Sequence, residues 1–168
     1  MKNSFLFLVF ITLIHIAAFT QPTGSDTRTL TTKIADILAR FPVQNSYQQN
    51  NSMQQIAELG ENGLSQMVMM WAARGKGNNT ALEYALSGFT SFVSQAGKET
   101  LRARTVRTFC TALPKLPDDN GKNFIIQQLE IIGKDDAVSC LQPYLRNETL
   151  AGAASRALAQ INTVSAEK

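Results

Sequence analysis

The chain has 168 residues, of which 44% are hydrophobic and 17% are charged, and its formal net charge is only +3. This small positive excess argues against an electrostatic nucleic-acid binder, and we expect no nucleic-acid partner. The length suits a single domain with one continuous core.

Residues 1–20 are predicted to form a secretory signal peptide. Lys2 precedes an apolar run of about 15 residues, which ends in small side chains. An uncleaved anchor is the less favoured alternative, because a spanning helix needs about 20 apolar residues. Cleavage before Phe19 or before Gln21 fits equally well. We therefore expect an exported protein, periplasmic or extracellular, without a membrane span after cleavage. His15 is the only histidine, so the mature chain would contain none.

Three glycines divide the rest of the chain into similar lengths. Gly60, Gly97 and Gly133 are about 36 residues apart, and each follows one apolar helical stretch and precedes another. Such a period is typical of repeat arrays in which helix pairs stack on one another. We expect each glycine to take a left-handed, helix-ending conformation.

Apolar residues recur with helical spacing throughout, and no stretch alternates with a period of two for long enough to be a strand. Gly, Pro, Asn and Asp mark the junctions between these stretches. The sequence therefore predicts an all-α chain of eight helices in four pairs, at about 26–40 with 46–59, 61–74 with 80–96, 98–113 with 121–132, and 134–145 with 147–161.

The two cysteines are predicted to be buried free thiols. Cys110 and Cys140 would enter an oxidising compartment, where pairing is possible. Their different offsets from Gly97 and Gly133 correspond to an axial displacement of about 9 Å. Neighbouring helices are themselves about 8–10 Å apart, whereas a disulfide needs Cα atoms within about 7 Å.

The segment from Gly133 to Ile161 resembles a HEAT repeat. Pro143 stands where the first helix of that family often carries a bending proline, and Ala157 and Leu158 match the pattern near the end of its second helix. The family's usual Asp and Arg in the inter-helix turn are not matched. The signature of the rival tetratricopeptide repeat is absent. The resemblance implies a right-handed α-solenoid (superhelix) of about four HEAT-like helix pairs after the signal peptide.

A more specific resemblance is carried by residues 75–88, 124–129 and 133–136. These segments are similar to the HEAT region of large exported bacterial proteins, where it precedes a sugar-active domain of the 3-keto-disaccharide hydrolase type. The resemblance covers roughly residues 30 to 161. The sugar-active domain is not in this chain, so none of its catalytic residues can be carried over.

These features favour an exported, non-catalytic HEAT-repeat scaffold or protein-interaction module over residues 21–168. The alternative is the N-terminal portion of a carbohydrate-active hydrolase, and a third possibility is a direct carbohydrate-binding module. The expected partner is accordingly a protein, a covalently linked downstream domain or a carbohydrate. No polar capping unit follows Leu150, Ala154 and Leu158, so we expect the repeat domain to be truncated at its C-terminal end.

A mature chain without histidine cannot assemble a Ser-His-Asp or Cys-His centre or a usual zinc site. We therefore predict no catalytic residue, no metal ligand and no cofactor. Residues 116–121 faintly resemble a calcium loop, but helix capping explains their acids better. Arg102, Arg104 and Arg107 form a basic cluster for which a solvated face is favoured, with an acidic partner or sugar acid as the alternative.

A polar group at a loop–helix junction is the leading candidate for ligand contacts. Its members are Asn78, Asn79, Glu83 and Tyr84, whose amides and aromatic ring suit a sugar or a peptide, although turn and cap roles explain most of them. Thr80 and Glu83 have the form of a capping box. Second helices line the concave face of HEAT repeats, which extends the candidate binding surface to Ser87, Ser91, Asn123, Gln127 and Gln160.

Overall fold

The computed structural model describes the backbone of residues 26–166 and the side chains of residues 26–161. The predicted signal peptide, its cleavage site and His15 lie outside the described residues. Within them the chain is all-α, with eight α-helices and two short 3-10 helices. These are α1 Leu30–Leu38, α2 Ser46–Glu58, α3 Gly60–Met69, α4 Thr80–Val93, α5 Glu99–Ala112, η1 Leu113–Lys115, α6 Asp119–Ile132, α7 Asp135–Leu141, η2 Gln142–Arg146 and α8 Ala151–Ala166.

The eight predicted helices are confirmed, with differences at their ends. α3 stops at Met69, five residues before the predicted end, since Trp71 turns into the core. α7 gives way to the 3-10 helix η2 around Pro143, which lacks the N–H that an α-helix would use. α8 begins later than predicted and continues past Ile161 to Ala166.

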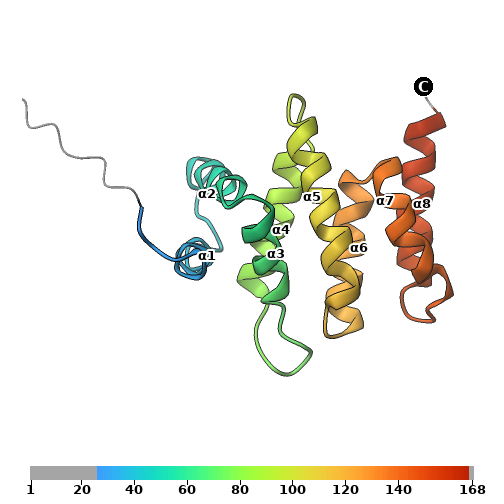
Figure 1. Cartoon of the computed structure of the whole chain (residues 1–168), viewed down its shortest axis with the longest axis horizontal. Helices are drawn as coiled ribbons and strands as arrows, with labels where there is room; N and C mark the ends of the chain where they lie inside the picture. The colour runs from blue at the N-terminus through green and yellow to red at the C-terminus, as the bar shows by residue number, and fades with distance from the viewer. Residues whose placement is uncertain (1–25, 167–168) are drawn as a thin grey trace, which may run out of the picture.

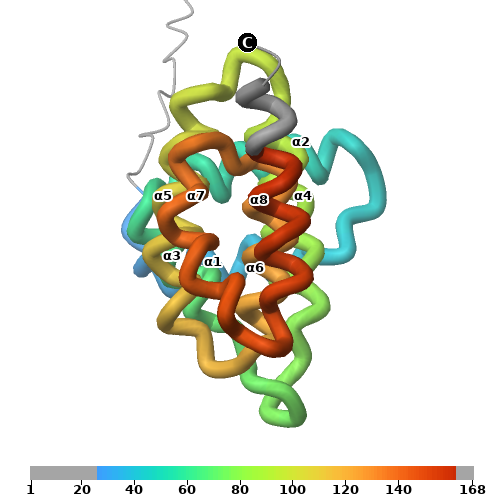
Figure 2. The backbone as a smooth tube through the Cα atoms, turned by 90° about the vertical axis from the view of Figure 1, so that its right-hand side faces the viewer, coloured from blue at the N-terminus to red at the C-terminus, as the bar shows by residue number. Residues whose placement is uncertain are grey.

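The helices pack in two layers (Figures 1 and 2). One layer consists of α1, α3, α5 and α7, and each of these helices contacts the next one in the layer. The other consists of α2, α4, α6 and α8, with the same neighbour contacts. Figure 2 looks along the stack, with α3, α5 and α7 on one side and α4, α6 and α8 on the other.

The core runs continuously between the layers. Its largest fully buried side chains include Phe89 of α4 and Phe109 of α5. At the C-terminal end, Leu150 and Ala154 are also buried. Their burial comes from the preceding helices, because α6, α7 and η2 all pack against α8.

The three periodic glycines are required for two different physical reasons. Gly60 and Gly97 have φ of +69° and +80°, the left-handed conformation predicted for them. Gly133 does not, since its φ is −67°. A Cβ atom there would lie 2.5 Å from the carbonyl oxygen of Leu129 and 2.9 Å from Cβ of Ala137. The prediction for Gly133 was therefore wrong in conformation, and close packing is what requires glycine there.

This difference predicts that asparagine is tolerated better than alanine at Gly97 but not at Gly133. Gly97→Ala should cost about 1–2 kcal/mol because alanine resists positive φ, and Gly97→Asn should cost less, because asparagine tolerates that region better. Gly133→Ala should cost about 1–3 kcal/mol by overpacking, and Gly133→Asn should be at least as destabilised. Urea unfolding of the four variants measures these costs. If asparagine were less destabilising than alanine by the same amount at both positions, the two glycines would not be required for different reasons.

A disulfide joins Cys110 of α5 to Cys140 of α7, with their Cα atoms 5.5 Å apart. The prediction of two free thiols was therefore wrong. The expected axial offset was counted from Gly97 for Cys110 and from Gly133 for Cys140, which assumed that the two glycines occupy equivalent positions in their repeats. Gly97 and Gly133 differ in conformation, however, and α5 and α7 pack directly against each other within one layer.

Reduction of this disulfide should lower the free energy of unfolding by about 3–4 kcal/mol, because the bond closes a loop of about 30 residues in the unfolded chain. Thermal unfolding with and without a phosphine reductant measures the effect. The Cys110→Ser, Cys140→Ser double variant is the control and should not respond to the reductant. Two thiols titrating in the native, unreduced protein would contradict the pairing.

No helix within the described residues is both long enough and apolar enough to cross a membrane.

Candidate functional site

The loop between α3 and α4 is held in place by the side chain of Asn79. Its Oδ1 accepts a hydrogen bond from the N–H of Ala72 at 2.9 Å, and its Nδ2 donates to the carbonyl oxygen of Ala72 at 2.8 Å. Next to it, Oδ1 of Asn78 accepts from the N–H of Thr80 at 2.8 Å. Both asparagines therefore shape the loop, as their predicted turn roles imply.

Asp118 ties this loop to the start of α6. One carboxylate oxygen accepts from the N–H of Gly121 at 2.9 Å and so caps α6. The other accepts from the N–H of Arg74 at 2.7 Å, in the α3–α4 loop. The hydrogen bonds from Gly121 and Arg74 hold the pKa of Asp118 below its usual value. Capping, predicted for the acids of residues 116–121, is confirmed for Asp118.

An open polar hollow of about 540 Å³ lies between this loop and the first turns of α4 and α6. Its volume is in the range of small-molecule sites, roughly 300–1,000 Å³. The loop, α4 and α6 all contribute to its lining, which consists of Trp71, Ala72, Arg74, Gly75, Gly77, Asn78, Asn79, Thr80, Glu83, Asp118, Asn120, Asn123, Phe124 and Gln127.

Part of the predicted binding surface meets in this hollow and part does not. The predicted residues that line it are Asn78, Asn79, Glu83, Asn123 and Gln127. The others are placed elsewhere: Tyr84 and Ser91 are exposed on α4, Ser87 is half-buried on α4, and Gln160 is exposed on α8. The structure therefore groups residues from two distant sequence segments and leaves the remaining candidates as separate surface positions.

Several polar side chains of the hollow are not engaged with the protein. In the described part of the chain, the side chains of Glu83, Asn120, Asn123 and Gln127 form no hydrogen bond or ion pair. The predicted capping box would have occupied Glu83, but that prediction was wrong. Thr80 lies inside α4, and Asn79 precedes the helix without a side-chain cap. The Glu83 carboxylate is therefore available to a ligand.

An aromatic pair packs beside these polar groups. The rings of Trp71 and Phe124 have centroids 5.1 Å apart, and both residues line the hollow. Trp71 belongs mainly to the core, where 93% of its surface is covered. Phe124, Asn120 and Arg74 were not among the predicted binding residues. The topology could have predicted their proximity. In two stacked antiparallel helix pairs, the α3–α4 and α5–α6 connections lie at the same end of the helices, so residues near them come close together.

The chemistry of the hollow suits binding by hydrogen bonds. An amide offers donors and acceptors in one plane, and a carboxylate offers acceptors only. Asp118 acts here as a hydrogen-bond acceptor, and its two oxygens already hold the N–H groups of Arg74 and Gly121. No group of three or more His, Cys, Asp or Glu side chains is placed to hold a metal ion within the described residues.

The lowered pKa of Asp118 predicts a pH dependence of stability. A carboxyl whose pKa is depressed by folding stabilises the protein above its unfolded pKa, near 3.9, and this stabilisation is lost as pH falls through the folded value. Asp118→Asn keeps the cap but loses the acceptor for Arg74. It should be less stable than the wild type at pH 7, and the difference should shrink as pH falls below about 4. Urea unfolding at several pH values measures this, and parallel pH profiles would contradict it.

No protein-family profile, no curated protein and no solved structure matches this chain significantly. What the chain does must therefore be inferred from its own residues and their geometry.

Proposed function

We propose that this chain is an exported, non-catalytic interaction module of the HEAT type, which binds a neutral, hydroxyl-rich ligand, a carbohydrate, in the hollow between the α3–α4 loop and α6. The observation that carries the proposal is the convergence of Asn78, Asn79, Glu83, Asn123 and Gln127 on one hollow.

The stacking of the helices supports the repeat character of the module. Each helix of a layer contacts the next helix of the same layer, and the members of each pair also contact one another. This contact pattern supports the proposal of an α-solenoid, because every unit of a solenoid packs mainly on its neighbours. In this proposal α2, α4, α6 and α8 are the second helices of four units.

The side chains of the hollow support a sugar as the ligand class. Vicinal hydroxyls both donate and accept hydrogen bonds, and the unengaged amides of Asn120, Asn123 and Gln127 can do the same. The lining combines the acidic residues Glu83 and Asp118 with the basic residue Arg74, so that no strong charge of one sign selects for an ion.

The disulfide supports export. Disulfides persist in oxidising compartments and are rare in the cytosol, and Cys110 and Cys140 are paired. This agrees with a secreted or periplasmic location.

A glycan array probed with the purified, oxidised chain tests the proposal, followed by calorimetry with the best-binding glycan. The Asn123→Ala, Gln127→Ala double variant should weaken binding at least about fivefold, since each lost hydrogen bond contributes about 0.5–1.5 kcal/mol. The Ser91→Ala, Gln160→Ala double variant is the matched control and should bind as the wild type does. Binding to no glycan, or equal binding by both double variants, would contradict the proposal.

A protein partner is the second candidate. It is favoured by large apolar side chains left exposed in the layer of second helices, namely Tyr47 on α2, Tyr84 on α4 and Ile131 on α6. Aromatic residues are enriched in protein interfaces. Tyr84→Ala in the same glycan assay separates the two candidates, because Tyr84 lies outside the hollow and its loss should leave glycan binding unchanged.

A further inference from the structure

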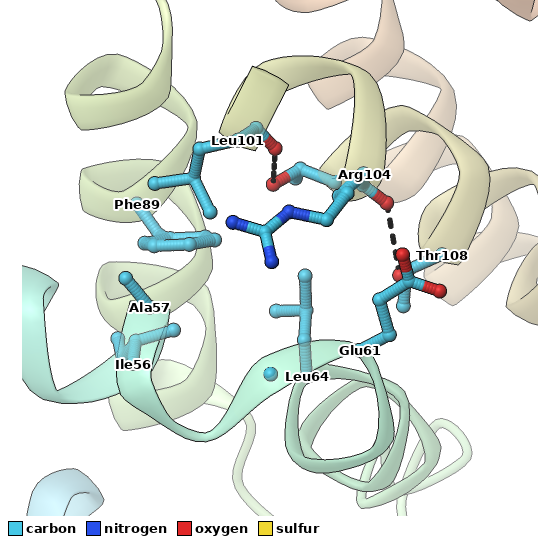
Figure 3. A pocket seen from close by; sticks show the side chains of 10 residues that line it. Ile56, Ala57, Glu61, Leu64, Phe89, Leu101, Arg104 and Thr108 are labelled. Carbon is cyan, nitrogen blue, oxygen red and sulfur yellow. Dashed lines mark hydrogen bonds between the residues drawn. The ribbon is translucent and has the colours of Figure 1, made fainter. Parts of the chain in front are cut away.

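A second concave region lies near the opposite end of α4. Its open part, about 400 Å³, is lined by the end of α2, Phe92 of α4 and the beginning of α5. Its narrow inner part continues between α2, α3, α4 and α5 (Figure 3). Ala57, Leu101 and Arg104 line both parts, which are therefore adjacent, and we call the two together the groove. Glu83 and Phe92 lie about 13 Å apart along α4, so this groove is separate from the polar hollow.

Arg104 is the unusual group in this groove. Figure 3 shows its guanidinium turned into the groove, among Phe89, Leu101 and Leu64. In the described residues this guanidinium forms no hydrogen bond and no ion pair. Arg104 is exposed to solvent on one side, and a guanidinium carries five N–H donors in a planar fork. The inner part around it is lined by apolar side chains together with Glu61, Thr105 and Thr108.

The neighbouring arginines of α5 behave differently. Arg102 is paired with Asp136 at 3.1 Å, and it also donates to the carbonyl oxygen of Ile132 at 2.8 Å. Arg107 is paired with Glu61 at 2.6 Å. The three arginines were expected to form one solvated face. Two of them are paired with carboxylates, and Arg104 is the one without an anionic partner.

A second cation lies at the open end of the groove. Nζ of Lys98 is 4.4 Å from the centroid of the Phe92 ring, and Lys98 lines the groove together with Arg104. Lys98 directly precedes α5, whose N-terminus adds partial positive charge. Among the carboxylates nearby, Glu99 accepts from the N–H of Gly97 and Glu61 is paired with Arg107. Glu58 lines the open part and holds no cation among the described residues.

We propose that this groove binds a small carboxylate that carries an apolar group. The carboxylate accepts two parallel hydrogen bonds from Arg104, with Lys98 as a second charge, and the apolar group rests on Phe92, Leu101 and Ala57. The open part has the volume of a small-ligand site. The inner part has room for only about one water molecule, so the ligand lies in the open part, which Arg104 and Lys98 also line. This site is independent of the proposed carbohydrate site.

Calorimetry with N-acetyl-L-phenylalanine and its neutral amide tests the site. The acid should bind and the amide should bind at least about tenfold more weakly, because only the acid offers a charged bidentate acceptor. Arg104→Gln should weaken binding of the acid at least about tenfold, and Arg104→Lys by less, since lysine keeps the charge but not the fork. Glu58→Gln should strengthen binding by removing a like charge. Higher salt should weaken it.

Arg146→Gln is the matched control, because Arg146 is also an exposed arginine, its side chain forms no hydrogen bond or ion pair within the described residues, and it lies outside the groove lining. It should change the affinity by less than about twofold. Circular dichroism checks that each variant is folded. The proposal is overturned if the acid does not bind at millimolar concentration, if the amide binds as tightly, or if Arg146→Gln weakens binding as much as Arg104→Gln does. The Asn123→Ala, Gln127→Ala variant should bind the acid normally, so failure of one site leaves the other testable.

Discussion

The mutual burial of apolar faces between successive helix pairs is the constraint on which the rest of the structure depends. A helix as short as α3 or α7 is only marginally stable in isolation, and it persists because neighbours on several sides cover its apolar face. Phe89 and Phe109 are examples, since both are fully buried in the common core. Because each pair packs side by side with the next, the connections lie at the ends of the helices, along the two edges of the stack (Figure 1).

This placement of the connections produces both concave regions. At one end, the α3–α4 loop and the start of α6 surround the polar hollow, and Asp118 joins them through two backbone N–H groups. Towards the other end, the end of α2, the end of α4 and the start of α5 form the groove that contains Arg104. Both are lined by residues that the stacking brings together from different units. Neither needs a departure from the helical packing.

Much of the fold could be predicted because helical periodicity is a local property. The eight helices, the cap at Asp118 and the left-handed glycines at Gly60 and Gly97 all follow from short stretches of sequence. Errors arose where equivalence between repeats was assumed. Gly133 is in the same place in the period but is required for close packing, and the pairing of Cys110 with Cys140 depends on how α5 and α7 pack.

The candidate sites divide in the same way. The polar character of Asn78, Glu83, Asn123 and Gln127 is visible in the sequence, but their convergence depends on the stacking of α4 and α6. The three arginines of α5 look alike in the sequence, and only the positions of Asp136 and Glu61 decide that Arg104 is the unpaired one. The sequence by itself therefore determined the helices and the kinds of side chain they carry, since both depend on nearby residues. The tertiary structure alone decided which of these side chains meet, because such contacts join residues far apart in the chain.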